Sequence, residues 1–126
     1  MPEASSVQRL VLVEDEALIR LDISECLRDI GYEVEEAASA TQALSFLQAK
    51  DGAVAGVVID LGLPDRRGDD LAADLRAANP SLPIIIASGF SSNEVRGRFA
   101  GDAFTAFVDK PFNAAQIERA LKAMAL

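Results

Sequence analysis

Apolar residues occur along the chain in five short runs, each of which predicts a β-strand. The runs Val54–Ile59 and Leu82–Ala87 are almost continuously apolar, as expected of central strands that are buried on both faces. Residues Tyr32–Ala37 alternate weakly between apolar and polar, which is typical of an edge strand. The two remaining runs are Arg9–Val13 and Ala106–Asp109.

Between and after these runs, apolar residues recur at helical spacing, which predicts five α-helices. Leu18, Leu21, Leu27 and Ile30 mark the first helix, which Gly31 ends. Three other helices begin with pairs spaced as capping boxes, namely Ser39 with Gln42, Ser91 with Glu94, and Asn113 with Gln116. The apolar positions of the later helices are Ala43, Leu44 and Leu47, then Leu71, Leu75 and Ala78, then Val95 and Phe99, and finally Ile117, Ala120, Leu121 and Met124.

This alternation of strands and helices predicts an α/β domain, with a parallel sheet and helices on both of its faces. The links between elements are too short for a second domain, so residues 9–126 are expected to form one domain. Residues 1–8 are expected to be a flexible N-terminal segment.

The chain has 126 residues, a formal net charge of −8 and no histidine. Without histidine, Ser-His-Asp and Cys-His catalysis, imidazole metal sites and a phosphohistidine donor role are excluded. The acidic balance argues against nucleic acid as a ligand, because phosphates are bound by clustered lysine and arginine. No apolar run approaches the roughly 20 residues of a membrane span and no signal-peptide layout is present, so a cytoplasmic protein is expected. The single cysteine, Cys26, lies in a helical apolar pattern and is expected in the core.

Polar side chains that can bind ions or take part in catalysis end four of the five predicted strands. Glu14 and Asp15 end the first strand, Asp60 the third, Ser88 the fourth and Lys110 the fifth. Because ligands bind at the carboxyl ends of parallel strands, these side chains are expected to converge in one shallow pocket. Each residue alone is compatible with a turn, a helix cap or a solvated position, but their recurrence at one edge favours a functional site.

The residue types in this pocket indicate its chemistry. Three carboxylates within a few ångströms repel one another and need a compensating cation to stay ionised. Carboxylate oxygens without sulfur or imidazole select Mg²⁺ or Ca²⁺ over zinc. Lys110 supplies a second positive charge for a phosphate, and Ser88 supplies a hydrogen-bond donor. Together these groups predict a site for a transferring phosphoryl group, in which an aspartate can be the covalent acceptor.

Four motifs stand at these strand ends: VLVEDE (Val11–Glu16), VVIDLGLPDRRG (Val57–Gly68), PIIIASG (Pro83–Gly89) and FVDKPF (Phe107–Phe112). In their order and separations they resemble the receiver domains of two-component response regulators, over nearly the whole chain from Arg9 onward. The resemblance implies a flavodoxin-like, doubly wound, five-stranded parallel sheet with strand order 2-1-3-4-5. The run ASGF is similar to a subset of receivers found as single-domain regulators or as C-terminal receivers of hybrid histidine kinases.

Carried over residue by residue, the resemblance implies that Asp60 accepts a phosphoryl group from a sensor histidine kinase or a histidine phosphotransfer protein. It also implies a Mg²⁺ site made by Asp15, Asp60, the backbone carbonyl of Gly62 and, through metal-bound water, Glu14. Lys110 would pair with the acceptor carboxylate and then with the phosphoryl group.

The same resemblance implies a conformational switch. Ser88 occupies the position of the family's switch hydroxyl, where threonine is commoner, and Phe107 that of its switch aromatic. Phosphorylation would draw Ser88 inward, let Phe107 follow, and so relay the signal to a downstream target protein. Phe90 would shield the acceptor from one side.

Two other functions are compatible with the sequence. The first is a receiver-like protein-interaction module that works without phosphorylation, which the complete set of acids, hydroxyl and lysine argues against. The second is an aspartate-nucleophile phosphatase, but such enzymes carry a general acid two residues after the nucleophile, where this chain has Gly62. The chain is therefore expected to catalyse its own phosphoryl transfer and autodephosphorylation rather than multiple turnover of a substrate.

Overall fold

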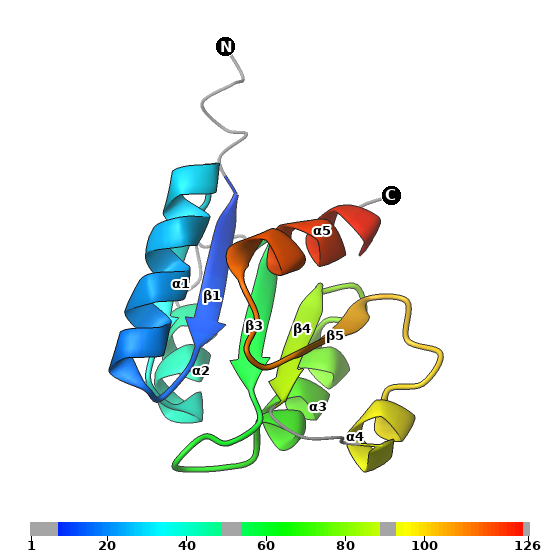
Figure 1. The fold of residues 1–126 in the computed structure, drawn as a ribbon. Helices are drawn as coiled ribbons and strands as arrows, with labels where there is room; N and C mark the ends of the chain where they lie inside the picture. Colours follow the sequence, from blue (N-terminus) through cyan, green and yellow to red (C-terminus); the bar gives the residue numbers. More distant parts are fainter. Residues whose placement is uncertain (1–7, 49–53, 89–92, 125–126) are drawn as a thin grey trace.

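Residues 8–48, 54–88 and 93–124 are described by a computed structural model, in which strands and helices alternate along the chain (Figure 1). The strands are β1 (Arg9–Val13), β2 (Glu33–Ala37), β3 (Gly56–Asp60), β4 (Ile84–Ser88) and β5 (Thr105–Asp109). The helices are α1 (Ala17–Ile30), α2 (Ala40–Gln48), α3 (Gly68–Ala78), α4 (Asn93–Arg98) and α5 (Ala114–Met124).

The five strands form one parallel sheet in the order β2-β1-β3-β4-β5. The predicted α/β class and the strand order 2-1-3-4-5 are thereby confirmed. The order reverses at β1, so β1 and β3 are neighbours although a strand and two helices separate them in sequence. This places the ends of β1 and β3 side by side at the point where open α/β sheets bind ligands.

Helices cover both faces of the sheet, and strand side chains alternate between them. On one face, Leu12 and Val58 pack with residues of α1 and α5, such as Leu27 and Ile117. On the other face, side chains of α2, α3 and α4 pack on strand residues such as Ile59. The central strands β3 and β4 are buried along their whole length, as their continuous apolar runs predicted.

The buried stripe of α1 does not coincide with the apolar residues that mark the helix in the sequence. Leu27 is buried, but Leu18, Leu21 and Ile30 are exposed, and Leu18 is 83% accessible. Cys26 is also exposed, so its expected place in the core was wrong. The turn that faces the sheet is formed by Ile23, Leu27 and a serine between them.

That serine, Ser24, explains the shift. It is fully buried, and its hydroxyl has two acceptors for its one proton within hydrogen-bond distance, the carbonyl of Leu21 (3.0 Å) and Glu36 Oε2 (2.9 Å) on β2. A satisfied polar side chain thus occupies a core position that an apolar pattern leaves out.

Two of the three predicted capping pairs are present in the described residues. Asn113 Oδ1 accepts from the Gln116 N–H (2.9 Å) and Gln116 Oε1 accepts from the Asn113 N–H (2.8 Å), which is a reciprocal capping box. Ser39 Oγ accepts from the Gln42 N–H (3.2 Å). The third pair begins at Ser91, which lies outside the described residues, as do Phe90, Gly89 and residues 1–7 of the N-terminal segment.

None of the helices in the described ranges is both long enough and apolar enough to cross a membrane.

Candidate functional site

The carboxyl edge of the sheet brings the predicted acids together. Glu14 and Asp15 directly follow β1, and Asp60 is the last residue of β3. One carboxylate oxygen from each of the three residues lies within 4.8 Å of the others. Glu14 and Asp60 are buried, whereas Asp15 is exposed, so the cluster opens to solvent on the side of Asp15.

Lys110, which follows β5, reaches this cluster with its ammonium group. Its Nζ lies 2.5 Å from Asp60 Oδ1 and 3.7 Å from Glu14 Oε1. Its backbone N–H donates to the carbonyl of Ser88 (2.8 Å), which ties the end of β5 to the end of β4. Burial disfavours the charged lysine, but the hydrogen bond and charge of Asp60 outweigh it and raise the pKa of Lys110 above its usual 10.5.

Glu14 is the buried acid for which the chain supplies the least compensation. Its Oε2 accepts from the Glu16 N–H (3.1 Å), but within the described residues its buried Oε1 has no hydrogen-bond partner. Burial is the main cause that raises the pKa of Glu14 above its usual 4.5, and the charges of Asp60 and Asp15 add to it. A buried oxygen without a partner needs an explanation, and an ion is a common one.

The donor set fits a hard divalent cation. Three carboxylates face one ammonium group, so the cluster carries an excess of negative charge when all of its groups are ionised. Its exposed side leaves access for an ion, and its oxygen-only donors match the preference of Mg²⁺ and Ca²⁺. The orphaned Oε1 of Glu14 is consistent with the same ligand.

Gly68 allows the chain after β3 to return close to Asp60, and Gly62 lies beside the carboxylate of Asp60. A Cβ atom at Gly62 would lie 3.7 Å from Asp60 Oδ2, so the backbone of Gly62 runs beside the carboxylate. A Cβ atom at Gly68 would overlap the backbone carbonyl of Asp60, so only glycine fits where α3 begins. The Gly68 N–H donates to the carbonyl of Leu61 (3.0 Å) and closes the base of this loop.

Ser88 and Phe107 lie on neighbouring strands and on the same face of the sheet. Ser88 is buried at the end of β4 and is paired in register with Asp109, two residues after Phe107. Phe107 is half-buried, with its ring centroid 6.5 Å from that of Phe99. The guanidinium of Arg96 lies 4.8 Å above the Phe107 ring, a contact that the sequence did not predict.

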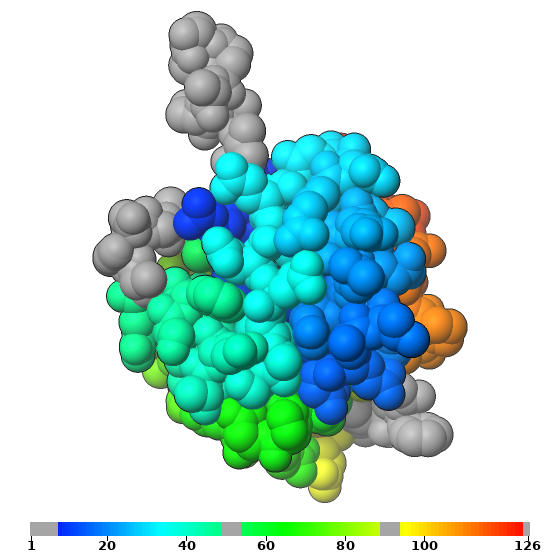
Figure 2. Space-filling model, turned by 90° about the vertical axis from the view of Figure 1, so that its left-hand side faces the viewer, coloured from blue at the N-terminus to red at the C-terminus, as the bar shows by residue number. Residues whose placement is uncertain are grey.

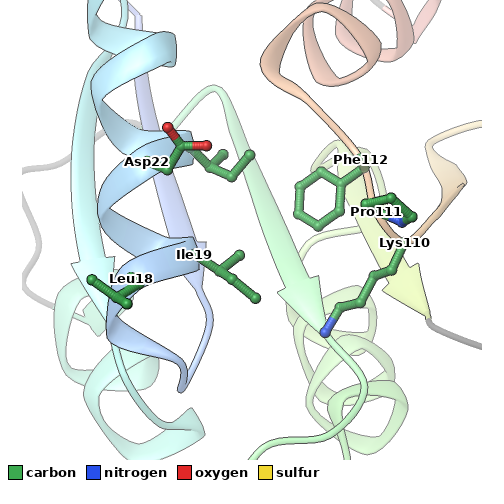
Figure 3. Close-up of a pocket in the computed structure, with 7 residues that line it drawn as sticks. Leu18, Ile19, Asp22, Lys110, Pro111 and Phe112 are labelled. Carbon is green, nitrogen blue, oxygen red and sulfur yellow. The ribbon is translucent and has the colours of Figure 1, made fainter.

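A groove of about 460 Å³ lies beside this site, between α1 and the segment that follows β5 (Figure 3). Ile19 and Phe112 face each other across it, and the amino group of Lys110 reaches from its edge toward the end of β3. The exposed Leu18 and Ile19 extend this apolar surface over α1. The sequence did not predict this surface, because helical spacing marked Leu18 as part of a helix without saying which way it faces.

Comparisons with known proteins agree with this geometry. The family model described as "Response regulator receiver domain" matches residues 10–122. Sensor kinase CckA of Brucella abortus is 33% identical over 97% of this chain but only 13% of its own length. Transcriptional regulatory protein PdtaR of Mycobacterium tuberculosis is 31% identical over 95% of this chain and 58% of its own length. A response regulator receiver protein from Sinorhizobium medicae, whose structure is solved, is 28% identical with a TM-score of 0.83, and the match covers 95% of both chains. The chain therefore spans 13% and 58% of these two curated relatives.

Proposed function

The chain belongs to the response regulator receiver domain family, and on this premise we propose that it is a phosphorylation-dependent signalling switch with Asp60 as phosphoacceptor. The observation that carries the proposal is the buried Asp60 carboxylate, 2.5 Å from the Lys110 ammonium and within 4.8 Å of two further carboxylates. We assign residues 9–126 to this receiver domain and the phosphoryl donor to a histidine of a partner protein, since this chain has none.

We assign a Mg²⁺ site to the acidic cluster. Asp15, Asp60 and the backbone carbonyl of Gly62 would hold the ion directly, and Glu14 would act through a water molecule. When bound, the ion neutralises charge on the phosphoryl oxygens. The oxygen-only donor set supports this assignment, as does Glu14 Oε1, which has no hydrogen-bond partner among the described residues.

The transfer itself requires little covalent chemistry from the protein. A carboxylate oxygen of Asp60 attacks the phosphorus of the donor phosphohistidine, and the new O–P bond forms as the N–P bond breaks. The electron pair of the broken bond returns to the donor imidazole. Lys110 pairs with the Asp60 carboxylate before transfer and would bind a phosphoryl oxygen afterwards, so its positive charge faces the acceptor at both stages.

Ser88 and Phe107 would convert the new phosphate into a surface change. The Ser88 hydroxyl would bind a phosphoryl oxygen, and Phe107 would turn into the space that Ser88 leaves. The two residues share one face of adjacent strands, which supports this coupling. Phosphorylation then favours one of two conformations by the contacts that only that conformation makes.

The groove beside Lys110 is the surface to which we assign the partner that donates the phosphoryl group, a sensor histidine kinase or a histidine phosphotransfer protein. Its apolar wall on α1 is exposed, and it adjoins the acceptor through Lys110 (Figure 3). A partner helix seated there would bring a histidine to the edge of the acidic cluster.

Incubation with acetyl phosphate and Mg²⁺ tests the phosphoacceptor. Intact mass measurement should show one phosphoryl group on the wild type and none on Asp60→Asn. Asp74→Asn is the matched control, because Asp74 is an exposed aspartate in a surface pair with Arg66, and it should be modified like the wild type. A wild type that is not modified, or an Asp60→Asn variant that is modified equally, contradicts the assignment and favours an interaction module that works without phosphorylation.

A further inference from the structure

The loop that joins β3 to α3 is bound at its tip to the first turn of α2. Asp65 Oδ1 accepts a hydrogen bond from the Ala40 N–H (3.0 Å). Its Oδ2 accepts from the Thr41 N–H (2.9 Å) and from the Thr41 hydroxyl (2.7 Å). In Figure 2 the green residues that follow β3 lie directly against α2 at the lower edge of the molecule.

These contacts make Asp65 a helix cap supplied from 24 residues away in the chain. The first N–H groups of a helix have no partner within the helix, and the positive end of its dipole favours a carboxylate there. The hydrogen bond from Thr41, followed by those from the two N–H groups, lowers the pKa of Asp65 to about 2. Asp65 is therefore an anion at neutral pH and holds the helix end strongly.

The end of β2, which leads into α2, is in turn bound to the residue that follows β1. The Glu14 N–H donates to the carbonyl of Ala37, the last residue of β2, over 2.9 Å, and α2 begins three residues later. A continuous path of hydrogen bonds and short links thus runs from Glu14 through the start of α2 to Asp65. This path connects the chain segment that carries Glu14 and Asp15 to the loop that carries Gly62.

The segment between Gly62 and Asp65 is short and stiff, so anchoring Asp65 also restricts where the backbone of Gly62 lies. Only Leu63 and Pro64 separate the two residues, and the ring of Pro64 fixes one of its backbone angles. The base of the loop is held separately by the Gly68 N–H on the carbonyl of Leu61. The tip is held by Asp65, so the backbone of Gly62 lies between two anchors.

We propose that Asp65 is a positioning residue, which fixes the distance between the backbone of Gly62 and the acids Glu14 and Asp15. A cation bound by both segments requires that this distance be held. The inference rests on the proposed function, because it concerns the same cation. Without Asp65, the base of the loop and α3 remain in place, but the tip moves independently of β1. The consequence is a weaker cation site in a protein that still folds.

The test compares Asp65→Ala with a matched cap variant of the same helix end. Ser39→Ala removes the hydroxyl that accepts from the Gln42 N–H, and Ser39 makes no contact with the β3–α3 loop among the hydrogen bonds of the described residues. Titration calorimetry with Mg²⁺ alone gives the affinity, and thermal unfolding gives the stability. We expect Asp65→Ala to weaken Mg²⁺ binding about tenfold, as loss of residues that orient metal ligands does. Ser39→Ala should change the affinity less than twofold while lowering the melting temperature by a similar amount.

A second variant and a second readout sharpen the result. Thr41→Val removes one of the three hydrogen bonds of Asp65 and should give an intermediate loss of Mg²⁺ affinity. In the metal-free protein, amide hydrogen exchange of the loop should be faster in Asp65→Ala than in Ser39→Ala. Equal effects of Asp65→Ala and Ser39→Ala on affinity, or no effect of Asp65→Ala, overturn this inference alone. A wild type that binds no Mg²⁺ overturns the proposed cation site and this inference with it.

Discussion

Two clusters of charged side chains lie at opposite edges of the same sheet, and they differ in how completely the chain satisfies them. The cluster at the carboxyl edge contains Glu14, Asp60 and Lys110, with Asp15 at its exposed side. The cluster at the amino edge of β4 and β5 is built around Arg76 of α3, with Asp102 as its acid. Both sets of side chains are largely withdrawn from solvent, apart from Asp15.

The cluster at the amino edge is complete within the chain. The guanidinium of Arg76 donates to Asp102 Oδ2 (2.7 Å) and to Thr105 Oγ1 (2.9 Å). It also donates to three backbone carbonyls at the ends of α3, β4 and β5, those of Asn79 (3.0 Å), Leu82 (2.7 Å) and Phe104 (3.0 Å). Its charges are balanced one against one, and its hydrogen bonds lower the pKa of Asp102 despite burial.

The cluster at the carboxyl edge has the opposite character. It holds three acids against one lysine, and a glutamate whose pKa is raised and one of whose oxygens has no hydrogen-bond partner in the part of the chain that the structure describes. A satisfied cluster of this size stabilises the fold, whereas an unsatisfied one lowers stability and persists where function requires it. The difference indicates which edge supports the architecture and which edge binds something from outside the chain.

Arg76→Ala should be the most damaging change to the amino edge. It removes five hydrogen bonds and leaves the Asp102 carboxylate without its cation, for an expected loss of about 3 kcal/mol in the free energy of unfolding. Urea denaturation measures the loss. Arg66→Ala is the control, because Arg66 forms a surface pair with Asp74 and its removal should cost less than about 1 kcal/mol. Equal losses in the two variants would contradict the importance of the cluster.

Asp69→Asn tests whether an acid affects Mg²⁺ binding because of where it lies or because it lacks partners. Asp69 lies near the site, at the start of α3, but its carboxylate is fully paired. Its buried carboxylate binds Arg67 (2.9 Å) and Arg98 (2.8 Å). We expect a loss of about 1.5 kcal/mol in unfolding free energy and no change in Mg²⁺ affinity, as for a structural cluster. Asp70→Asn is the neighbouring control, since the Asp70 side chain is 46% accessible and Arg98 is its one ion-pair partner among the described residues, so its effect should be smaller. A weakened Mg²⁺ affinity in Asp69→Asn would show that an acid near the site affects the cation even when its carboxylate is fully paired.

Glu14→Gln should raise, rather than lower, the free energy of unfolding of the metal-free protein. Neutralising this buried acid removes its repulsion with Asp60 and Asp15, and we expect a gain of about 1 kcal/mol in the metal-free protein. The same change should abolish most of the rise in melting temperature that Mg²⁺ produces in the wild type, because a ligand stabilises the state that binds it. Thermal unfolding with chelator and with millimolar Mg²⁺ measures both effects. A metal-free variant less stable than the wild type would mean that Glu14 supports the fold.

The residues of the carboxyl edge were predictable from the sequence because each follows an apolar run that ends in a parallel strand. Asp60 and Lys110 needed no knowledge of the third dimension beyond that rule. The strand order came from the resemblance to a family, since local patterns do not say which strands are neighbours. By contrast, Arg76 and Asp65 escaped prediction. The side chains that bind Arg76 lie 26 and 29 residues away, the start of α2 that binds Asp65 lies 24 residues away, and no local spacing marks either contact.

The helix α1 shows a different limit of pattern reading. Leu18 and Leu21 have the spacing of core residues, yet they are exposed. Ser24 is buried instead, and its hydroxyl is hydrogen-bonded to Glu36 on β2. Hydrophobic periodicity identifies a helix but does not say which of its apolar residues face the sheet and which face another protein. Of the residues in this helix, only Cys26 was expected in the core, and that expectation was wrong.

The smallest expected effect is the pH dependence that the amino edge confers on stability. Hydrogen bonds from Thr105, Phe104 and Arg76 outweigh burial and hold the pKa of Asp102 below its ordinary 3.8. Its contribution is therefore fully present above the pKa of the unfolded state and is lost as the pH falls through the folded-state pKa. The difference in unfolding free energy between the wild type and Asp102→Asn should be constant near neutral pH and narrow by less than about 1 kcal/mol at a pH of about 3. If the difference in unfolding free energy between the wild type and Asp102→Asn stayed constant down to acidic pH, packing rather than charge would stabilise the amino edge. The contrast between the two edges would then not be electrostatic.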